Sequence, residues 1–412
     1  MAISPEIKIH LIHDLLPFWL GMIDKENGGF YGCVDAEGNI DKKADKGCVL
    51  NSRILWVFST CYKLCMDGAL SEVKLQDAGY SSVDILEAAR HAYNFFRDNY
   101  FDQEYGGIFW SVTYDGKPSD TTKHAYNHAF AIYALCEFFE VTGNMEAFKL
   151  AYYLKNCVEN IFKDDIGYLE SFGRDFEPDD NPKLSENGVH AFRTTNTLLH
   201  IMEAYTELYR INKETKDQFV KGKIYSILDI FENKIYNPTE GRLEIFFDEH
   251  YNSLIDLRSL GNDIEMSWVL DRTCAVLGDD ELTARLAPIS DTLARKTLEY
   301  GFDGHSLAYE IERGVTRETR AWWIQAEAVV GFTNAFMKTD DKEYKNAERK
   351  CWEFIRDHII TKTRPAEWYN EVSKEGVPDM SMPLVGEWKC PYHNVRMCIE
   401  ILRRNMKAKE EL

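Results

Sequence analysis

The segment EYGGIFWSVTYDGKPSD, residues 104–120, is short, aromatic and strand-like, with glycines and acids around it. It separates two stretches with helical periodicity, 82–99 and 125–142. Its spacing from similar segments is roughly 60–80 residues, which leaves room for two helices of ordinary length in each interval. The other segments of this kind are ENGGFYGCVDAEGNI (26–40), DIGYLESFGRDFEP (165–178), GRLEIFFDEHYNSLI (241–255), DGHSLAYEIERG (303–314) and PAEWYNEVSKEGVP (365–378). Six helix–helix–hairpin units predict a repeat architecture.

These repeats are predicted to close into a ring. An open solenoid needs polar capping repeats at both ends, and the sequence shows none. Helical periodicity also continues at 194–211, 265–277 and 319–337, and another helical stretch, 395–402, follows the last aromatic segment. Although a length of 412 residues alone suggests two or three domains, we therefore predict an all-α fold: one (α/α)6-barrel domain over residues 1–412, with short β-hairpins in the loops between helices.

Composition restricts the function. A net charge of −20 repels phosphate backbones, so we expect no nucleic-acid partner and a neutral small-molecule ligand. The chain has 9 Trp, 22 Tyr and 23 Phe, enough rings to line a sugar site as well as a large core. No apolar run reaches the length of a membrane span, and the N-terminus reads as an amphipathic helix rather than a signal peptide. Ten scattered cysteines without paired CxxC motifs are typical of reduced thiols, so we expect a cytoplasmic protein.

Several polar side chains interrupt apolar helical stretches, where an unpartnered polar group is unfavourable. Arg53 lies in VLNSRILWVF, and either an internal ion pair or a ligand oxygen would satisfy its guanidinium. Asn196, His200 and Glu203 share one helix face at spacings of four and three residues, as a site or as a solvated stripe.

Three aromatic or acidic segments raise the same question. In TRAWWIQAEAVVGF, Trp322 and Trp323 precede Glu327, and the tryptophans suit either a cavity wall or core packing. In GEWKCPYHNVRMC, Trp388 and His393 flank a Cys–Pro pair, where a histidine is structural or catalytic. In SLGNDIEMSW, residues 259–268, a glycine, an amide and two carboxylates form either a helix cap or the edge of a site.

Together these segments resemble the N-acylglucosamine 2-epimerase superfamily and, within it, the cellobiose 2-epimerases. The resemblance runs nearly end to end. It is carried by ENGGFYG, DKKADKGCVLNSRILW, KHAYNHAFAIYAL, LSENG, NTLLHIMEAYTELY, WWIQAEAVVGF and EWKCPYHNVRMC. It implies an (α/α)6 barrel that inverts C2 of the reducing glucose unit without a metal or organic cofactor, through ring opening, loss of the C2 proton and a cis-enediolate.

The resemblance also implies roles for individual residues. His393 matches one of two catalytic histidines, and His200 assists ring opening. Arg53 and Asn196 stabilise the enediolate oxygen. The remaining residues are those that hold the sugar, Tyr126, Trp322, Trp323 and Trp388, and those that orient histidines or substrate, Glu203, Glu265 and Glu327.

One position departs from the family pattern. Where the family has Gly-His-Asp-Ile-Glu with the second catalytic histidine, this chain has Gly261-Asn262-Asp263-Ile264-Glu265. An asparagine amide forms hydrogen bonds but does not titrate near neutral pH, so we expect impaired epimerisation. The substitution could be an introduced change that traps substrate, a natural change of chemistry, or a loss that another proton donor replaces.

Three other functions remain open on the residues alone. An aldose–ketose isomerase needs a single base, here His393. An inverting glycoside hydrolase needs paired carboxylates, but Asp263 and Glu265 are two residues apart and point to different helix faces. A non-catalytic sugar-binding relative is the last. For each of these functions we expect a monomer that binds a disaccharide and does not associate with a membrane.

Overall fold

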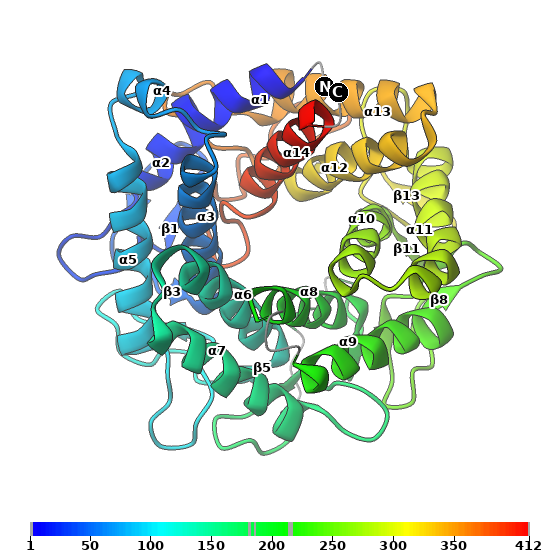
Figure 1. Ribbon diagram of the computed structural model, residues 1–412, viewed down its shortest axis with the longest axis horizontal. Helices are drawn as coiled ribbons and strands as arrows, with labels where there is room; N and C mark the ends of the chain where they lie inside the picture. Colours follow the sequence, from blue (N-terminus) through cyan, green and yellow to red (C-terminus); the bar gives the residue numbers. More distant parts are fainter. Residues whose placement is uncertain (1–2, 180–182, 185–186, 213–216, 411–412) are drawn as a thin grey trace.

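The inner wall of the molecule is a closed ring of helices. In this computed structural model, which describes residues 3–179, 183–184, 187–212 and 217–410, six helices form that ring (Figure 1): α3 (Cys48–Met66), α6 (Ala125–Thr142), α8 (Thr195–Ile211), α10 (Leu260–Leu277), α12 (Trp322–Thr339) and α14 (His393–Glu410). Each packs against the next, and α14 packs against α3. Residues Ser185 and Glu186 of the LSENG segment lie outside the described residues.

An outer layer of helices covers this ring. The helices α5 (Ser82–Asn99), α7 (Met145–Cys157), α9 (Gln218–Ile230), α11 (Asp280–Gly301) and α13 (Lys342–Phe354) pack on α3, α6, α8, α10 and α12 in turn. Three of them continue into π-helical turns, η2 (Val158–Phe162), η4 (Phe231–Ile235) and η5 (Ile355–Ile359), and a short helix, α4 (Glu72–Asp77), precedes α5. Inner α6 is buried from Ala125 to Phe138, whereas α5 buries one apolar face, as an outer helix should.

The first helical segment completes the outer layer by covering the last inner helix. The segment comprises α1 (Ser4–His10), the π-helical turn η1 (Leu11–Leu15) and α2 (Leu16–Gly21). Both α1 and η1 contact α14 (Figure 1). The predicted (α/α)6 barrel is therefore confirmed. None of the described helices is both long and apolar enough to span a membrane.

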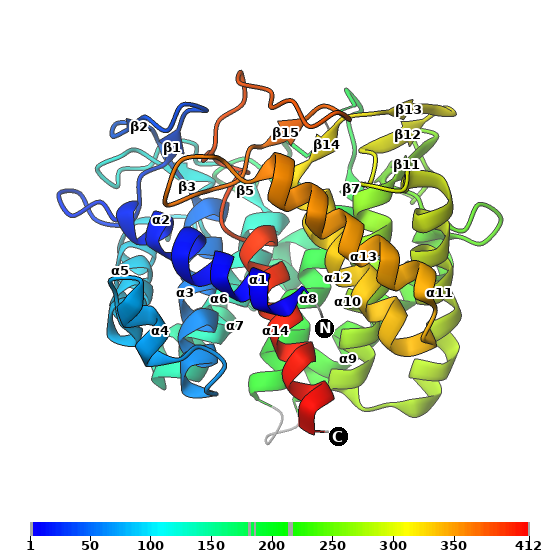
Figure 2. The ribbon, with the colours of Figure 1, turned by 90° about the horizontal axis from the view of Figure 1, so that it is seen from above.

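Short antiparallel strands gather at one end of the barrel (Figure 2). The strand that precedes an inner helix pairs with a strand of the next aromatic segment along the chain, so the hairpins join neighbouring repeats. These pairs are β3 (Lys46–Gly47) with β4 (Ser111–Val112), β5 (Lys123–His124) with β6 (Ser171–Phe172), β7 (Arg193–Thr194) with β10 (Phe246–Phe247), β11 (Leu257–Ser259) with β12 (Glu310–Glu312), and β14 (Arg320–Ala321) with β15 (Glu371–Val372). The remaining pairs are β1 (Cys33–Val34) with β2 (Ile40–Asp41), β8 (Tyr236–Asn237) with β9 (Arg242–Leu243), and β12 with β13 (Val315–Arg317).

A buried basic residue precedes every inner helix. The six are Lys46, Lys123, Arg193, Arg258, Arg320 and Lys389. Except for Arg258, which pairs with Asp263 of its own helix, each forms an ion pair with an acid of the preceding hairpin region: Asp24, Asp102, Asp164, Asp303 and Glu367. These pairs fix each hairpin over the start of an inner helix.

Replacing Lys46 with methionine should lower the free energy of unfolding by about 3–5 kcal/mol, because it leaves the buried Asp24 carboxylate without its cation. The Lys46 Nζ donates to Asp24 Oδ2 at 2.9 Å and to the Gly28 carbonyl at 2.6 Å. The measurement is the urea unfolding midpoint. Lys117→Met is the matched control, since Lys117 pairs with Asp115 at 2.7 Å on the exposed surface. Equal midpoints for both variants would contradict the role given to the buried pair.

Helix boundaries agree with the sequence periodicity except at some ends. Helices α5 and α6 begin and end at the predicted residues, and α8, α12 and α14 differ by one to eight residues at an end. The start of α10 was predicted at 265 but lies at Leu260, because the Ser259 Oγ accepts from the Asn262 backbone N–H and caps the helix there. Residues 261–263 consequently belong to the first turn of α10.

Candidate active site

A cavity of about 240 Å³ opens where the inner helices begin, below the hairpins. Nine of the predicted site residues line it: Arg53, Tyr126, Asn196, His200, Glu265, Trp322, Trp323, Trp388 and His393. They come from all six inner helices or from the loop before α14, and most lie in the first two turns of their helix. Seven residues that the sequence reasoning missed complete the lining: Tyr309, Arg317, Ala321, Asn370, Glu371, Met382 and Lys389.

His393 begins α14 and is held by a carboxylate behind it. Its Nδ1 lies 2.7 Å from Glu327 Oε1, and Glu327 also accepts from the Trp268 indole N–H at 2.9 Å. Burial, reinforced by the Arg396 cation, holds the pKa of His393 well below its ordinary value, so the ring is neutral. A carboxylate at Nδ1 requires the proton there, which leaves the Nε2 lone pair on the ring edge that lines the cavity.

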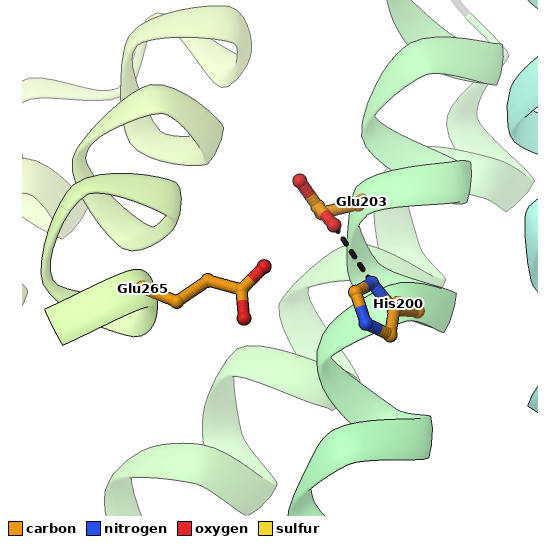
Figure 3. A group of neighbouring side chains, drawn as sticks. All are labelled: His200, Glu203 and Glu265. Atoms are coloured by element: carbon orange, nitrogen blue, oxygen red, sulfur yellow. Dashed lines mark hydrogen bonds and ion pairs between the residues drawn. The ribbon is translucent and has the colours of Figure 1, made fainter. Parts of the chain in front are cut away.

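His200 on α8 has the same arrangement. Its Nδ1 lies 2.9 Å from Glu203 Oε2, one turn along the helix (Figure 3). The rings of Tyr126 and Phe130 pack against the imidazole, with distances of 5.1 and 4.5 Å between ring centres. Burial lowers the pKa of His200. The alternative of a solvated stripe is wrong, because His200 and Glu203 are 3% and 2% exposed.

Arg53 is a buried cation that faces the cavity without a carboxylate partner. Its Nη2 donates to the Tyr126 hydroxyl at 2.8 Å, and its Nη1 donates to the Trp388 carbonyl at 3.3 Å. The guanidinium also lies 4.1 Å from the centre of the Phe130 ring. Among the residues that the structure describes, no acid forms an ion pair with Arg53, and its Nε has no hydrogen-bond partner. The site therefore contains an uncompensated positive charge that suits an anionic oxygen.

Asn262 is buried on the same helix as Glu265 but is not among the residues that line the cavity. The Ser259 hydroxyl donates to Asn262 Oδ1 at 2.7 Å, and within the described part of the chain Asn262 Nδ2 has no partner. Gly261 allows close packing here, since a Cβ atom would come within 2.3 Å of the Trp323 ring.

The two acids that follow Asn262 point to different places. Asp263 lies outside the cavity, where its Oδ1 accepts from the Leu243 backbone N–H at 2.9 Å and it pairs with Arg258. Glu265 lines the cavity and faces the His200–Glu203 pair (Figure 3), and burial raises its pKa to about 7. Asp263 and Glu265 therefore do not form the carboxylate pair of a glycoside hydrolase.

Arg396, one turn after His393 on α14, joins the acids below the cavity. It donates to Glu203 Oε1 at 2.8 Å, to Glu327 Oε1 at 2.7 Å and to Glu265 Oε1. Glu203 and Glu327 thus lie behind the histidines instead of lining the cavity. Although donor atoms of His200, Glu203 and Glu265, and of Glu265, Glu327 and His393, lie within 4.8 Å of one another, a metal ion there would meet this guanidinium.

Known proteins resemble this chain in both sequence and fold. The model of the N-acylglucosamine 2-epimerase (GlcNAc 2-epimerase) family matches residues 29–396. The chain belongs to this family. A cellobiose 2-epimerase of Eubacterium cellulosolvens is 45% identical over 410 residues, covering 96% of this chain and 97% of the relative. The expectation of a carbohydrate epimerase is confirmed at the level of the family.

Solved structures of this epimerase family have the same fold. A sugar epimerase from a ruminal bacterium is 40% identical with a TM-score of 0.91, and the match covers 98% of this chain and 99% of that one. The cellobiose 2-epimerase of Bacillus thermoamylovorans B4167 is 39% identical with a TM-score of 0.88, covering 98% and 99%.

Proposed function

We propose that this epimerase acts at C2 of the reducing-end glucose of β-1,4-linked disaccharides, converting cellobiose to glucosyl-mannose, and that Asn262 slows the reaction. One observation carries the proposal: the same cavity is lined by a neutral His393, whose Nε2 is free of protein partners among the described residues, and by the Arg53 cation, which has no acid partner there. A base and an anion-stabilising donor are the two parts that proton abstraction next to a carbonyl needs. The cellobiose 2-epimerases among its relatives support the substrate class.

In the proposed reaction the sugar ring first opens, with His200 hydrogen-bonded to the reacting end. His393 Nε2 then takes the C2 proton, which the C1 aldehyde has acidified, and a cis-enediolate forms. Arg53 and Asn196 donate to the enediolate oxygen. Tyr126, Trp322, Trp323 and Trp388 hold the sugar, whose C–H faces suit aromatic rings. Glu203 and Glu327 orient the histidines, and Glu265, which lines the cavity, orients the substrate.

The second half of the reaction needs a proton on the opposite face of C2. The amide of Asn262 has no titrating proton to give. If His393 returns its proton to C2, the starting sugar is regenerated, and if it returns the proton to C1, a ketose forms. Since this route needs only one base, an aldose–ketose isomerase is the second candidate function.

Incubation with cellobiose in D2O tests the proposal. We expect deuterium to enter C2 of the reducing glucose faster than mannose appears, because His393 exchanges its proton with solvent between abstraction and return. His393→Asn replaces the proposed base with an amide that does not titrate, and it should abolish the exchange. A fructose-ended product would favour the isomerase, free glucose a hydrolase, and binding without exchange a non-catalytic sugar-binding protein.

We expect chelation to leave the exchange rate unchanged, because the proposed chemistry uses side chains alone. The measurement is C2 deuterium incorporation before and after prolonged dialysis against EDTA. A loss of exchange that Mg²⁺, Mn²⁺ or Zn²⁺ restores would contradict the cofactor-free mechanism.

We also propose a monomeric, cytoplasmic protein that binds no nucleic acid. The α1–α14 contact closes the ring without a partner chain, all ten cysteines are free thiols, and the net charge is −20. Light scattering with sedimentation would detect a stable dimer.

A further inference from the structure

A continuous hydrogen-bonded chain joins the two histidines below the cavity. It runs from His393 Nδ1 to Glu327 at 2.7 Å, from Glu327 to Arg396 Nη2 at 2.7 Å, from Arg396 Nη1 to Glu203 at 2.8 Å and from Glu203 to His200 Nδ1 at 2.9 Å. Its members come from α8, α12 and α14, so the barrel has to close before the chain exists.

Arg396 is the middle of this chain and is 1% exposed. Three buried carboxylates, Glu203, Glu265 and Glu327, surround it, and each accepts one of its N–H groups. A buried carboxylate without a cation takes up a proton instead of remaining charged. The guanidinium therefore keeps Glu203 and Glu327 in the form that accepts hydrogen bonds.

We propose that Arg396 is a positioning residue that fixes one tautomer at both histidines, with the proton on Nδ1 and the Nε2 lone pair toward the cavity. An ionised Glu327 or Glu203 can only accept, so the imidazole Nδ1 has to donate. Arg396 Nη2 also lies 3.4 Å from His393 Nδ1, but each of these two nitrogens is closer, at 2.7 Å, to Glu327 Oε1, which accepts from both. No hydrogen bond to Nε2 of His200 or His393 is present among the described residues, which leaves both lone pairs for the sugar. The catalytic consequence rests on the proposed function, but the tautomers do not.

Without the Arg396 cation, protonated carboxyls would donate to Nδ1 and move the imidazole proton to Nε2. Other groups near the histidines favour the present state more weakly. Trp268 donates to Glu327 at 2.9 Å, and Tyr392 donates to Glu203 at 3.3 Å. Of the other nearby cations, Arg53 and Lys389 do not contact either carboxylate that binds a histidine, and Arg272, which pairs with Glu207, lowers the pKa of Glu203 through its charge alone.

The ¹⁵N NMR spectrum of histidine-labelled protein, without sugar, tests this inference, with His200→Asn and His393→Asn assigning the signals. In the unmodified protein at neutral pH we expect both rings to be neutral with the proton on Nδ1. In Arg396→Met most of both rings should carry the proton on Nε2, whereas Arg396→Lys, which keeps a cation, should retain Nδ1–H. A proton on Nε2 of either ring in the unmodified protein overturns the proposal, as does an unchanged Nδ1–H in Arg396→Met.

Two further variants separate positioning from general damage. Arg193→Met removes another buried arginine, which pairs with Asp164 in a hairpin region outside the hydrogen-bonded chain, and should leave both tautomers unchanged. If Arg396→Met does not fold, the double variant Arg396→Met/Glu265→Gln removes one cation and one anion together. The histidine tautomers of this double variant then test the proposal by the same criteria. A failure of this inference shows in the NMR spectrum without substrate, while a failure of the proposed function shows as absent C2 exchange with correct tautomers.

Discussion

Asn262→His should raise the rate of epimerisation by about 10²–10⁴, equivalent to roughly 3–5 kcal/mol of activation free energy. The rest of the proposed machinery is assembled: His393, His200, Arg53 and Asn196 line one cavity. Asn262 lies on the first turn of α10, three residues before the cavity-lining Glu265, and we expect a longer imidazole at that position to reach the cavity. The new ring would supply the second proton carrier.

The readout is the appearance of the mannose-ended disaccharide from cellobiose, followed by chromatography. Asn262→Gln is the matched control, since it lengthens the side chain without adding a titrating group. A histidine at 262 should also make the rate depend on a group that titrates near about pH 6–7, with an optimum because one histidine has to be neutral and the other protonated. If the unmodified protein already epimerises cellobiose fast and Asn262→His does not raise the rate, another residue is the second proton carrier.

Arg53→Ala should lower turnover by about 10²–10³, equivalent to roughly 3–4 kcal/mol, because it removes a donor to the enediolate oxygen. The unpaired guanidinium at the cavity wall has no structural acid partner among the described residues whose loss would produce the same effect. The effect is measured as kcat in the Asn262→His protein and as C2 deuterium exchange in the unmodified one.

Two control variants distinguish a loss of catalysis from a loss of folding. Arg53→Lys keeps the charge but not the fork to Tyr126 and Trp388, so we expect partial recovery of kcat. Arg90→Ala removes an exposed arginine on an outer helix and should have no effect on turnover. Normal exchange in a folded Arg53→Ala protein would assign Arg53 to packing against Phe130 and Tyr392 instead of catalysis.

The architecture was predictable because each repeat carries a local signal. Glycine-flanked aromatic segments and helical periodicity are properties of neighbouring residues, and they were enough to predict the barrel. The pairing of strands between successive repeats was not predictable, because strands of two or three residues carry almost no pattern. The basic residues before the inner helices, such as Lys46 and Lys123, recur in the sequence, but their acid partners could only be identified once the hairpins were placed.

The site was predictable wherever a polar residue broke an apolar helix. Arg53 and the Asn196–His200–Glu203 face were found in this way, and Arg396, inside NVRMCIEIL, carries the same signal but was overlooked. Tyr309 and Arg317 could not be found because they lie on a hairpin, where polar and aromatic residues are ordinary. The hydrogen bond from the Ser259 hydroxyl to Asn262 Oδ1 is a side-chain contact, which periodicity does not describe.

The contact between the first and last helices has a consequence for synthesis on the ribosome. The apolar residues Ile7 and Leu11 are buried in a segment that packs on α14, which emerges after all other elements of the barrel. A nascent chain therefore exposes this apolar face until α14 has been synthesised, and a chaperone that recognises apolar helices would meet it early. Because α14 also carries His393 and Arg396, a product that terminates before α14 lacks both the helix that closes the barrel and the proposed base.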